Sequence, residues 1–281
     1  AETAGAIAAG DLSRRVEPAG GPTEAGRLGS ALNRMLAQIE EAFRIRGESE
    51  EHLRRFVADA SHELRTPLTS IRGYAELFRR GGLRSSEELA DAMRRMEEEA
   101  RRMGALVDDL LMLARLDEGR PVDRAPVRLD LLAADAVRDA QAVEPGRPVD
   151  LESEPVAVPG DEQRLRQVLG NLLANARVHT PAGTPVHVTV RAAGGVARLE
   201  VADEGPGMAP DVARRVFERF FRSDASRTRA GGGTGLGLSI VKALAEAHGG
   251  QVHVETAPGA GARFVVELPL ASVGEAARAG G

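Results

Sequence analysis

The chain has 281 residues, of which 42% are hydrophobic and 28% charged, and its formal net charge is −5. This composition supports packed cores in two or three small domains and argues against wholesale disorder. The acidic balance and the 3% aromatic content argue against a nucleic-acid-binding surface, and the absence of cysteine excludes disulfides, thiol catalysis and cysteine-zinc sites.

The N-terminal residues predict a signal connector. No stretch approaches the apolar length of a membrane span. A helix-like run over 1–9 leads into Gly-Asp-Leu-Ser-Arg-Arg-Val at 10–16, which resembles the connector of a HAMP signal-relay domain. Such domains follow a transmembrane helix. We therefore expect a partial HAMP domain over 1–45 at the cytoplasmic face of the bacterial membrane, associated with it only through transmembrane segments upstream of this sequence.

The next segment has the spacing of a coiled-coil helix. Its apolar residues recur in alternating steps of four and three: Leu28, Leu32, Met35, Ile39 and Ala42. The pattern lapses through 46–49 and resumes at 53. A break in heptad phase is a suitable place for a signal to act, and a solvated linker helix is an equally good interpretation.

A potentially reactive histidine follows on the helix. His62 is followed by Glu63, and Thr66 lies one turn along the same face, just before Pro67. Neutral imidazole is a good nucleophile near neutral pH, Glu63 could fix its tautomer or take its proton, and Thr66 could position a water. Pro67 lacks an N–H, so the helix can bend there. These residues suggest a phosphorylatable histidine; an exposed helical histidine without a chemical role is the alternative.

Two long helices joined by a short loop predict a helical hairpin over 46–120. The first ends at the breaker Gly81-Gly82, and Ser85 or Ser86 caps the second. The second helix carries a clean apolar seam: Leu89, Met93, Met96, Ala100, Met103, Val107 and Leu110. Because each helix keeps an uncovered apolar stripe, we expect two hairpins to pair in a four-helix bundle, which makes the chain a homodimer.

After a linker at 121–126, short β-like runs alternate with helical runs over 127–270. We expect strands at 186–191, 197–202, 251–255 and 263–268, and helices at 129–144, 161–179, 209–217 and 236–248. This mixture predicts an α+β sandwich with helices on one side of a sheet. The tail over 271–281 is expected to be disordered.

Three polar segments of this second half have features of a nucleotide site. Asn171 and Asn175 lie one helical turn apart, where their amide oxygens could face a hydrated Mg²⁺; two polar surface residues are the alternative. Asp203 follows a predicted strand and could accept from the exocyclic amine of adenine, while Gly205 and Gly207 would let the base approach the backbone. Glycine-rich backbone opening a helix suits a triphosphate, and that segment contains Gly233, Thr234, Gly235, Leu236 and Gly237.

The polar stretch 223–233 between the glycine segments is expected to form a lid over the nucleotide. Arg222, Arg227 and Arg229 could touch phosphate, with a solvated charged loop as the alternative.

These segments resemble, in order, the motifs of sensor histidine kinases. Residues 61–68 match the phosphoacceptor box at every position, and the N-box, first glycine box, F-box and second glycine box correspond to 167–176, 203–208, 217–222 and 231–238. The resemblance implies an all-α dimerisation region followed by an ATP-binding domain of the GHKL (Bergerat) type. It implies that His62 accepts the γ-phosphoryl group of ATP, with Glu63 as base, Thr66 serving the reverse phosphatase reaction and Asn175 contacting Mg²⁺. The phosphoryl group would pass to an aspartate on the receiver domain of a response regulator.

One position departs from the family pattern, because Val178 stands where the N-box usually has a lysine near the phosphates. Arg177 or a lid arginine could supply the charge. Four other histidines, His52, His187, His248 and His253, lack an acidic partner at a useful spacing and are interpreted as structural or surface residues.

Two other functions fit parts of the sequence. An ATPase of the gyrase and chaperone type needs a catalytic carboxylate in the N-box helix, where position 171 is asparagine, although Glu162 precedes it by several turns. That function gives His62 no role. A pseudokinase scaffold would bind nucleotide without transferring it, and Val178 favours it.

Overall fold

The computed structural model describes residues 15, 24–117, 124–222 and 234–271. The chain divides into two compact units, Ala1–His62 and Glu63–Gly281. The predicted connector apart from Arg15, the lid with Gly233, and the tail from 272 onward lie outside the described residues. Within the described ranges, no helix combines the length and the apolar character that crossing a membrane requires.

Helix α2 spans Glu24–Arg79 and includes both the predicted coiled-coil segment and His62. It continues through residues 46–49, where the heptad pattern lapses, and through Pro67. The proline removes one backbone donor but does not end the helix, since the turns on either side keep their own hydrogen bonds. The predicted helix end is confirmed: Gly82 N–H donates to the carbonyl oxygen of Leu77 at 2.9 Å, and Gly81 has a φ of +70°.

Helix α3 spans Ser86–Asp117 and begins with a reciprocal cap. The N–H of Glu88 donates to Ser85 Oγ, and the N–H of Ser85 donates to Glu88 Oε2, both at 3.1 Å. Two of the four unpaired donors at the helix start are satisfied in this way. Of the two predicted capping residues, Ser85 is therefore the cap.

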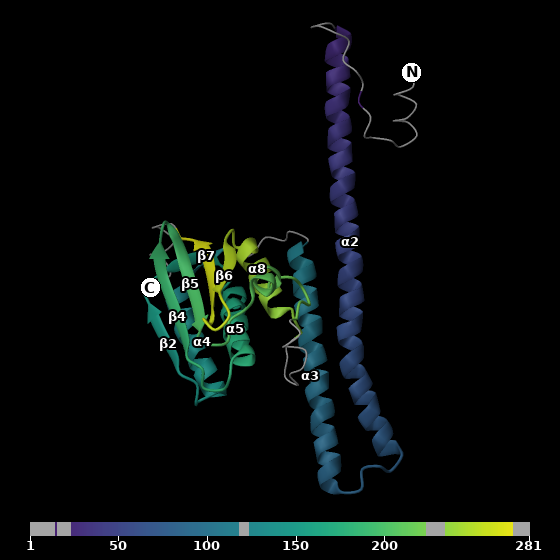
Figure 1. Cartoon of the computed structure of the whole chain (residues 1–281), viewed down its shortest axis with the longest axis vertical. Helices are drawn as coiled ribbons and strands as arrows, with labels where there is room; N and C mark the ends of the chain where they lie inside the picture. Colours follow the sequence, from purple (N-terminus) through teal and green to yellow (C-terminus); the bar gives the residue numbers. More distant parts are fainter. Residues whose placement is uncertain (1–14, 16–23, 118–123, 223–233, 272–281) are drawn as a thin grey trace. The chain divides into compact units, whose positions relative to one another are not determined.

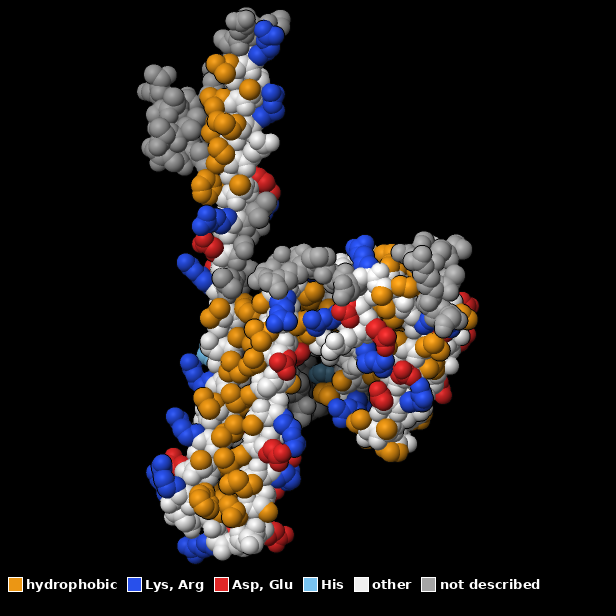
Figure 2. All heavy atoms as spheres, turned by 180° about the vertical axis from the view of Figure 1, so that it is seen from behind, with side chains coloured by type: hydrophobic (Ala, Val, Ile, Leu, Met, Phe, Trp, Pro, Cys, Tyr) orange, Lys and Arg blue, Asp and Glu red, His pale blue; other side chains and the backbone are white. Residues whose placement is uncertain are grey.

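Large apolar side chains remain exposed along the hairpin. Figure 2 shows hydrophobic side chains gathered along these helices, and in the second unit the exposed ones include Leu68, Phe78, Met93, Val107 and Leu111, each 41–55% exposed. A contiguous apolar stripe of this kind marks an interaction surface. It supports the homodimer that the sequence predicts.

The C-terminal part contains a five-stranded sheet. Its strands are β2 (Val149–Ser153), β4 (Val186–Ala193), β5 (Val196–Asp203), β6 (Gln251–Thr256) and β7 (Ala262–Pro269). They lie in the order β2-β4-β5-β7-β6, with β2 parallel to β4 and the other neighbours antiparallel. A separate two-stranded sheet pairs β1 (Ala125–Arg128) with β3 (Ala157–Gly160).

Helices α4 (Leu129–Val143), α5 (Glu162–His179) and α8 (Gly237–Ala247) cover one face of the five-stranded sheet (Figure 1), and the short α6 spans Pro210–Arg215. Alternate residues of β5, such as Leu199 and Val201, pack in one core with Leu172 of α5 and Ile240 of α8. Each of these four side chains is at most 1% exposed. The predicted α+β sandwich is confirmed, and every predicted strand and helix of this part is present to within two residues at each end. The sequence interpretation missed β1, β2 and β3, and β1 begins inside the predicted linker.

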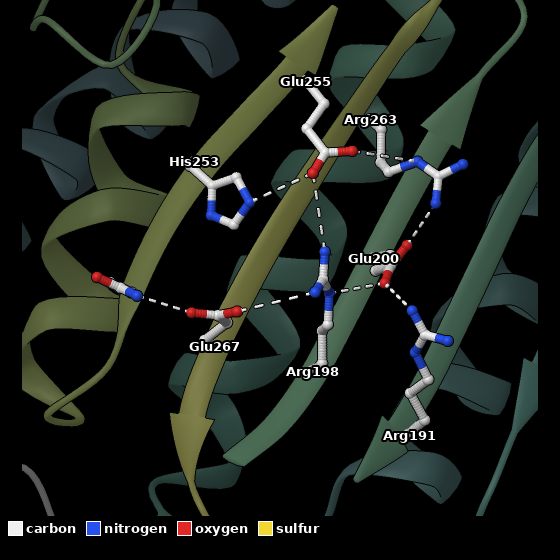
Figure 3. A network of polar contacts seen from close by, with 8 residues as sticks. Arg191, Arg198, Glu200, His253, Glu255, Arg263 and Glu267 are labelled. Atoms are coloured by element: carbon white, nitrogen blue, oxygen red, sulfur yellow. Dashed lines mark hydrogen bonds and ion pairs between the residues drawn. The ribbon is translucent and has the colours of Figure 1, made fainter. Parts of the chain in front are cut away.

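The other face of the sheet carries an ion-pair network instead of a third layer (Figure 3). Glu200 on β5, whose side chain is only 4% exposed, lies 2.8–2.9 Å from arginines on β4, β5 and β7: Arg191, Arg198 and Arg263. Further carboxylates, Glu255 and Glu267, lie 3.8–4.0 Å from Arg198. A buried carboxylate costs little when several charged donors satisfy it.

Candidate functional site

A cavity of about 350 Å³ in the C-terminal part brings together the three polar segments predicted for nucleotide binding. It is lined by α5, by the loop after β5 and by the start of α8, which lie far apart in the sequence. The predicted residues on its wall are Asn171, Asn175, Asp203, Gly207, Thr234, Gly235 and Gly237. A cavity of this size is typical of small-molecule sites.

The two asparagines of α5 both line the cavity, but their contacts differ. Asn171 Nδ2 donates to the carbonyl oxygen of Gly237 at 3.2 Å, so its side chain joins α5 to the first residue of α8. Asn175 is half-buried one turn further along α5. The two asparagines therefore line the same cavity, but Asn171 also links α5 to α8 through its hydrogen bond to Gly237.

The donor set at this cavity fits Mg²⁺ only in part. An amide oxygen such as that of Asn175 is a suitable ligand, because Mg²⁺ prefers oxygen and keeps several waters. Within the described ranges, no cluster of three or more His, Cys, Asp or Glu side chains could hold a metal ion. A cation here would need most of its oxygen ligands from phosphates and water.

Asp203 ends β5 and lines the cavity. Its Oδ1 accepts from the N–H of Gly205 at 2.9 Å. Burial raises the pKa of Asp203 above its usual value, although backbone hydrogen bonds from Gly205 and Ala262 and the charge of Arg147 act against this. The carboxylate is thus held in place at a partly desolvated position.

The glycines near Asp203 lie where neighbouring atoms leave no room for a Cβ. A Cβ at Gly205 would lie 2.5 Å from Thr180 Cγ2 and 2.7 Å from Asp203 Oδ1. Gly207 has a φ of +66°, and its Cβ would lie 1.9 Å from the carbonyl oxygen of Ala257. Gly261, which the sequence interpretation missed, has a φ of +71°, and its Cβ would lie 1.9 Å from the carbonyl oxygen of Asp203.

The second glycine segment forms the start of α8. Gly235 has a φ of +74°, and a Cβ there would lie 2.9 Å from the backbone of Phe220. Thr234 Oγ1 accepts from the N–H of Leu236 at 3.4 Å. Leu236 itself is fully buried, so it anchors the helix in the core and does not line the cavity wall.

Other residues on the cavity wall were partly anticipated. Val178 and Arg222 line it, whereas Arg227 and Arg229 lie outside the described residues. Asp109 of α3 also lines it and carried no sequence signal. Burial raises the pKa of Asp109 to about 6, with a smaller contribution from the charge of Asp108.

The predicted phosphoacceptor residues lie on α2. His62 and Thr66 are exposed, Glu63 is half-buried and Pro67 is buried. His62 is the last residue of the first compact unit, and Glu63 is the first residue of the second. The imidazole of His62 is therefore accessible from solvent.

The expectation that the other histidines lack acidic partners was wrong for two of them. His187 Nε2 lies 3.3 Å from Glu204 Oε1, a residue that follows the neighbouring strand β5, and His253 Nε2 lies 3.7 Å from Glu255 Oε1, two residues along β6. Strand pairing and the two-residue period of a strand create such partners. The side chain of His52 lies outside the described residues.

His248 is a buried structural residue. Its Nδ1 lies 2.7 Å from the carbonyl oxygen of Leu244, and its Nε2 accepts from the N–H of Asp161 at 3.2 Å. Nδ1 therefore carries the proton.

Three family models match consecutive parts of the chain. Residues 1–41 match the HAMP domain, residues 52–119 match the His Kinase A (phospho-acceptor) domain, and residues 160–272 match the histidine kinase-, DNA gyrase B- and HSP90-like ATPase model. The cavity lies mainly within the last of these segments, and His62 within the second.

The chain is also similar to known proteins along most of its length. It is 52% identical over 257 residues to the probable sensor histidine kinase TcrY of Mycobacterium tuberculosis, covering 90% of this chain and 54% of the relative. The structure of full-length ShkA in complex with AMPPNP is 33% identical with a TM-score of 0.57, covering 77% of this chain and 46% of that one. The Acinetobacter baumannii histidine kinase AdeS, 22% identical, has the same fold with a TM-score of 0.60, over 75% of this chain and 98% of that one. The chain spans about half the length of the curated relatives it matches.

Proposed function

We infer that this chain, which belongs to the sensor histidine kinase family of two-component systems, binds ATP in the 350 Å³ cavity and transfers the γ-phosphoryl group to His62. The observation that carries this proposal is the convergence on one cavity of residues from α5, the loop after β5 and the start of α8. Catalysis of phosphoryl transfer depends mainly on positioning and on charge stabilisation, and these segments are suited to both.

Each proposed residue has a separate task in binding. Asp203 accepts from the exocyclic amine of adenine, and Gly205 and Gly207 allow the base to approach the backbone. Thr234, Gly235 and the start of α8 at Gly237 face the phosphates with backbone N–H groups. Leu236 contributes by anchoring α8, and Gly233, which lies outside the described residues, would contribute to phosphate binding.

The chemical step is an in-line displacement at phosphorus. An imidazole nitrogen of His62 attacks the γ-phosphorus, a P–N bond forms, and the P–O bond to the β-phosphate breaks, releasing ADP. Glu63 takes the proton of the other ring nitrogen as positive charge develops on the imidazole. Asn175, with Asn171 beside it, would hold Mg²⁺, which supplies charge neutralisation for the triphosphate when bound.

The phosphoryl group then passes to an aspartate on the receiver domain of a response regulator. Thr66, exposed one turn after His62, would position the water for the reverse, phosphatase reaction. The exposed apolar stripe of the hairpin supports a homodimer, in which either subunit could supply the ATP. We place the chain at the cytoplasmic face of the membrane, where transmembrane segments outside this sequence would hold it.

A labelling experiment with the full 281-residue chain tests the transfer. Incubation with Mg²⁺ and ATP labelled at the γ-phosphate should give a protein label that is labile to acid and stable to alkali. His62→Gln should abolish the label and leave ATP affinity unchanged, whereas the control His187→Gln, which removes an exposed histidine outside the cavity, should keep the label.

The alternatives give different results in the same assay. Label that persists in His62→Gln would overturn the assignment of the phosphoacceptor. Release of free phosphate without labelled protein would indicate an ATPase, and ATP binding with neither product would indicate a scaffold.

A further inference from the structure

A buried arginine, Arg147, contacts Thr180, which lines the cavity together with Asp203. Arg147 follows α4 in the turn that leads into β2, and its side chain is only 4% exposed. Its Nε donates to Glu144 Oε2 at 2.9 Å. A buried cation is costly unless it is paired and its donors are satisfied, so the remaining contacts of this side chain matter.

Those contacts all go to the loop between α5 and β4. Nη1 donates to Thr180 Oγ1 at 2.8 Å and to the carbonyl oxygen of Thr184 at 2.9 Å, and Nη2 donates to the carbonyl oxygen of Pro181 at 3.1 Å. One planar guanidinium thus holds both ends of the segment 180–184. Lysine could not reproduce this fork of donors.

Thr180, which Arg147 holds in place, is itself part of the cavity wall. Its hydroxyl accepts from Arg147 and donates to the carbonyl oxygen of Ala176 at 2.7 Å, which fixes its rotamer. Its methyl group then points at Gly205, since a Cβ on that glycine would lie 2.5 Å from Thr180 Cγ2. Thr180 and Asp203 both line the cavity.

We propose that Arg147 is a positioning residue for base recognition. By fixing Thr180, it keeps in place the part of the cavity wall where the Asp203 carboxylate accepts from the exocyclic amine of adenine. This rests on the proposed binding of ATP in this cavity. A residue that only stabilised the loop would change the amount of folded protein, whereas a positioning residue also changes which base is preferred.

The charge of Arg147 adds a second effect. Burial raises the pKa of Asp203, and the positive charge of Arg147 is one of the factors that oppose this rise. Only the ionised carboxylate is a pure acceptor. Without Arg147, Asp203 takes up a proton at a higher pH, and binding of the adenine amine is lost at a higher pH.

The test compares ATP with ITP, in which a carbonyl oxygen replaces the exocyclic amine. Dissociation constants are measured by calorimetry with Mg²⁺, using the full chain and variants whose folding is checked by circular dichroism. Wild type should prefer ATP. Arg147→Met should weaken ATP binding by about tenfold and change ITP binding much less, as expected for the loss of a single well-placed hydrogen bond.

Three further variants make the result specific. Thr180→Val, which keeps the side-chain shape but loses the hydroxyl, should reduce the preference as Arg147→Met does, and the double variant should add little to either change. Arg147→Lys should keep the pH dependence of the wild type while losing part of the ATP preference. The control Arg166→Met removes an arginine of α5 that pairs with Glu162 at 2.9 Å, and its preference should equal that of wild type.

The outcomes separate this inference from the proposed function. If wild type prefers ATP, and folded Arg147→Met or Thr180→Val keeps the full preference, the positioning role is wrong and ATP binding stands. Should Arg147→Met fail to fold, an unchanged preference in both Arg147→Lys and Thr180→Val overturns the role equally. A wild type that binds neither nucleotide overturns the proposed function itself.

Discussion

Asn171 and Gly237 are joined by a hydrogen bond of 3.2 Å from the side-chain amide to the backbone carbonyl oxygen. This bond links the middle of α5 to the first residue of α8. The two elements form adjacent walls of the cavity. The bond therefore links the position of Asn171 and Asn175 on α5 to the position of the glycine segment at the start of α8.

Replacing Asn171 tests that coupling. Asn171→Ala should lower stability by about 1 kcal/mol, the usual contribution of one hydrogen bond. Asn171→Asp should cost more, because it places a carboxylate oxygen opposite a carbonyl oxygen. The shift in Tm should be roughly 2–4 °C per kcal/mol, measured by calorimetry without nucleotide. An aspartate variant as stable as wild type would contradict the donor role of the side chain.

Gly205→Ala should weaken ATP binding by about tenfold or more. The added Cβ would meet Thr180 Cγ2 at 2.5 Å and Asp203 Oδ1 at 2.7 Å, and overpacking at this wall must displace one of them. Thr180→Ser removes the methyl group and should restore part of the affinity in the double variant. Gly170→Ala is the matched control, since a Cβ there meets nothing within 4 Å. Calorimetric titration with ATP measures all four proteins.

Glu200→Gln should destabilise the sheet at neutral pH by about 3 kcal/mol, because it leaves three arginines without their buried carboxylate. Glu255→Gln should cost less than about 1 kcal/mol, since Glu255 is exposed and its arginine contacts are 3.8 Å long. Urea unfolding at pH 7 compares the two. Equal effects would contradict a special role for the buried carboxylate.

The same network predicts a pH dependence. Burial raises the pKa of Glu200, but hydrogen bonds from Arg191 and Arg263 and the charge of Arg198 outweigh it, so the pKa lies below its ordinary value of 4.5. A lowered carboxyl pKa stabilises the fold above the unfolded-state pKa and ceases to do so as pH falls through the folded-state value. The difference in unfolding free energy between wild type and Glu200→Gln should therefore shrink below pH 4.5. A constant difference down to pH 3 would contradict it.

Val178→Lys should restore the charge that the family pattern places beside the phosphates. Val178 lines the cavity, so an ammonium group there should tighten ATP binding by about two- to tenfold and adenosine binding not at all. The gain should fall with added salt, because screening weakens it. Val178→Met is the control for side-chain length. A gain shared by adenosine would point to packing instead of charge.

Most of the fold could be predicted from local pattern. The strands and helices from α5 onward follow hydrophobic periods that the sequence displays, and Ser85, one of the two predicted caps, caps α3. Strands β1, β2 and β3 were missed because each has only four or five residues. Such short strands depend on pairing partners far away in the chain and not on their own pattern.

The site was only partly predictable, for a related reason. Asn175 and Asp203 belong to motifs that can be read locally, and both line the cavity. Arg147 and Gly261 carry no local signal, because their importance comes from contacts with Thr180 and with the Asp203 backbone. These contacts join residues that are far apart in the sequence, and they form only when the sheet and the loops around it are folded.

The sequence alone determined the order of the domains, the two long helices of which the first carries His62, and the segments that line the cavity, because hydrophobic period, capping and glycine spacing act over a few residues. Only the tertiary structure decided which side chains meet. Packing α5 and α8 on one face of the sheet brought Asn171 to Gly237 and buried Arg147 against Thr180. Burial then set the electrostatics, since the pKa of Asp203 depends on how much water the surrounding elements exclude.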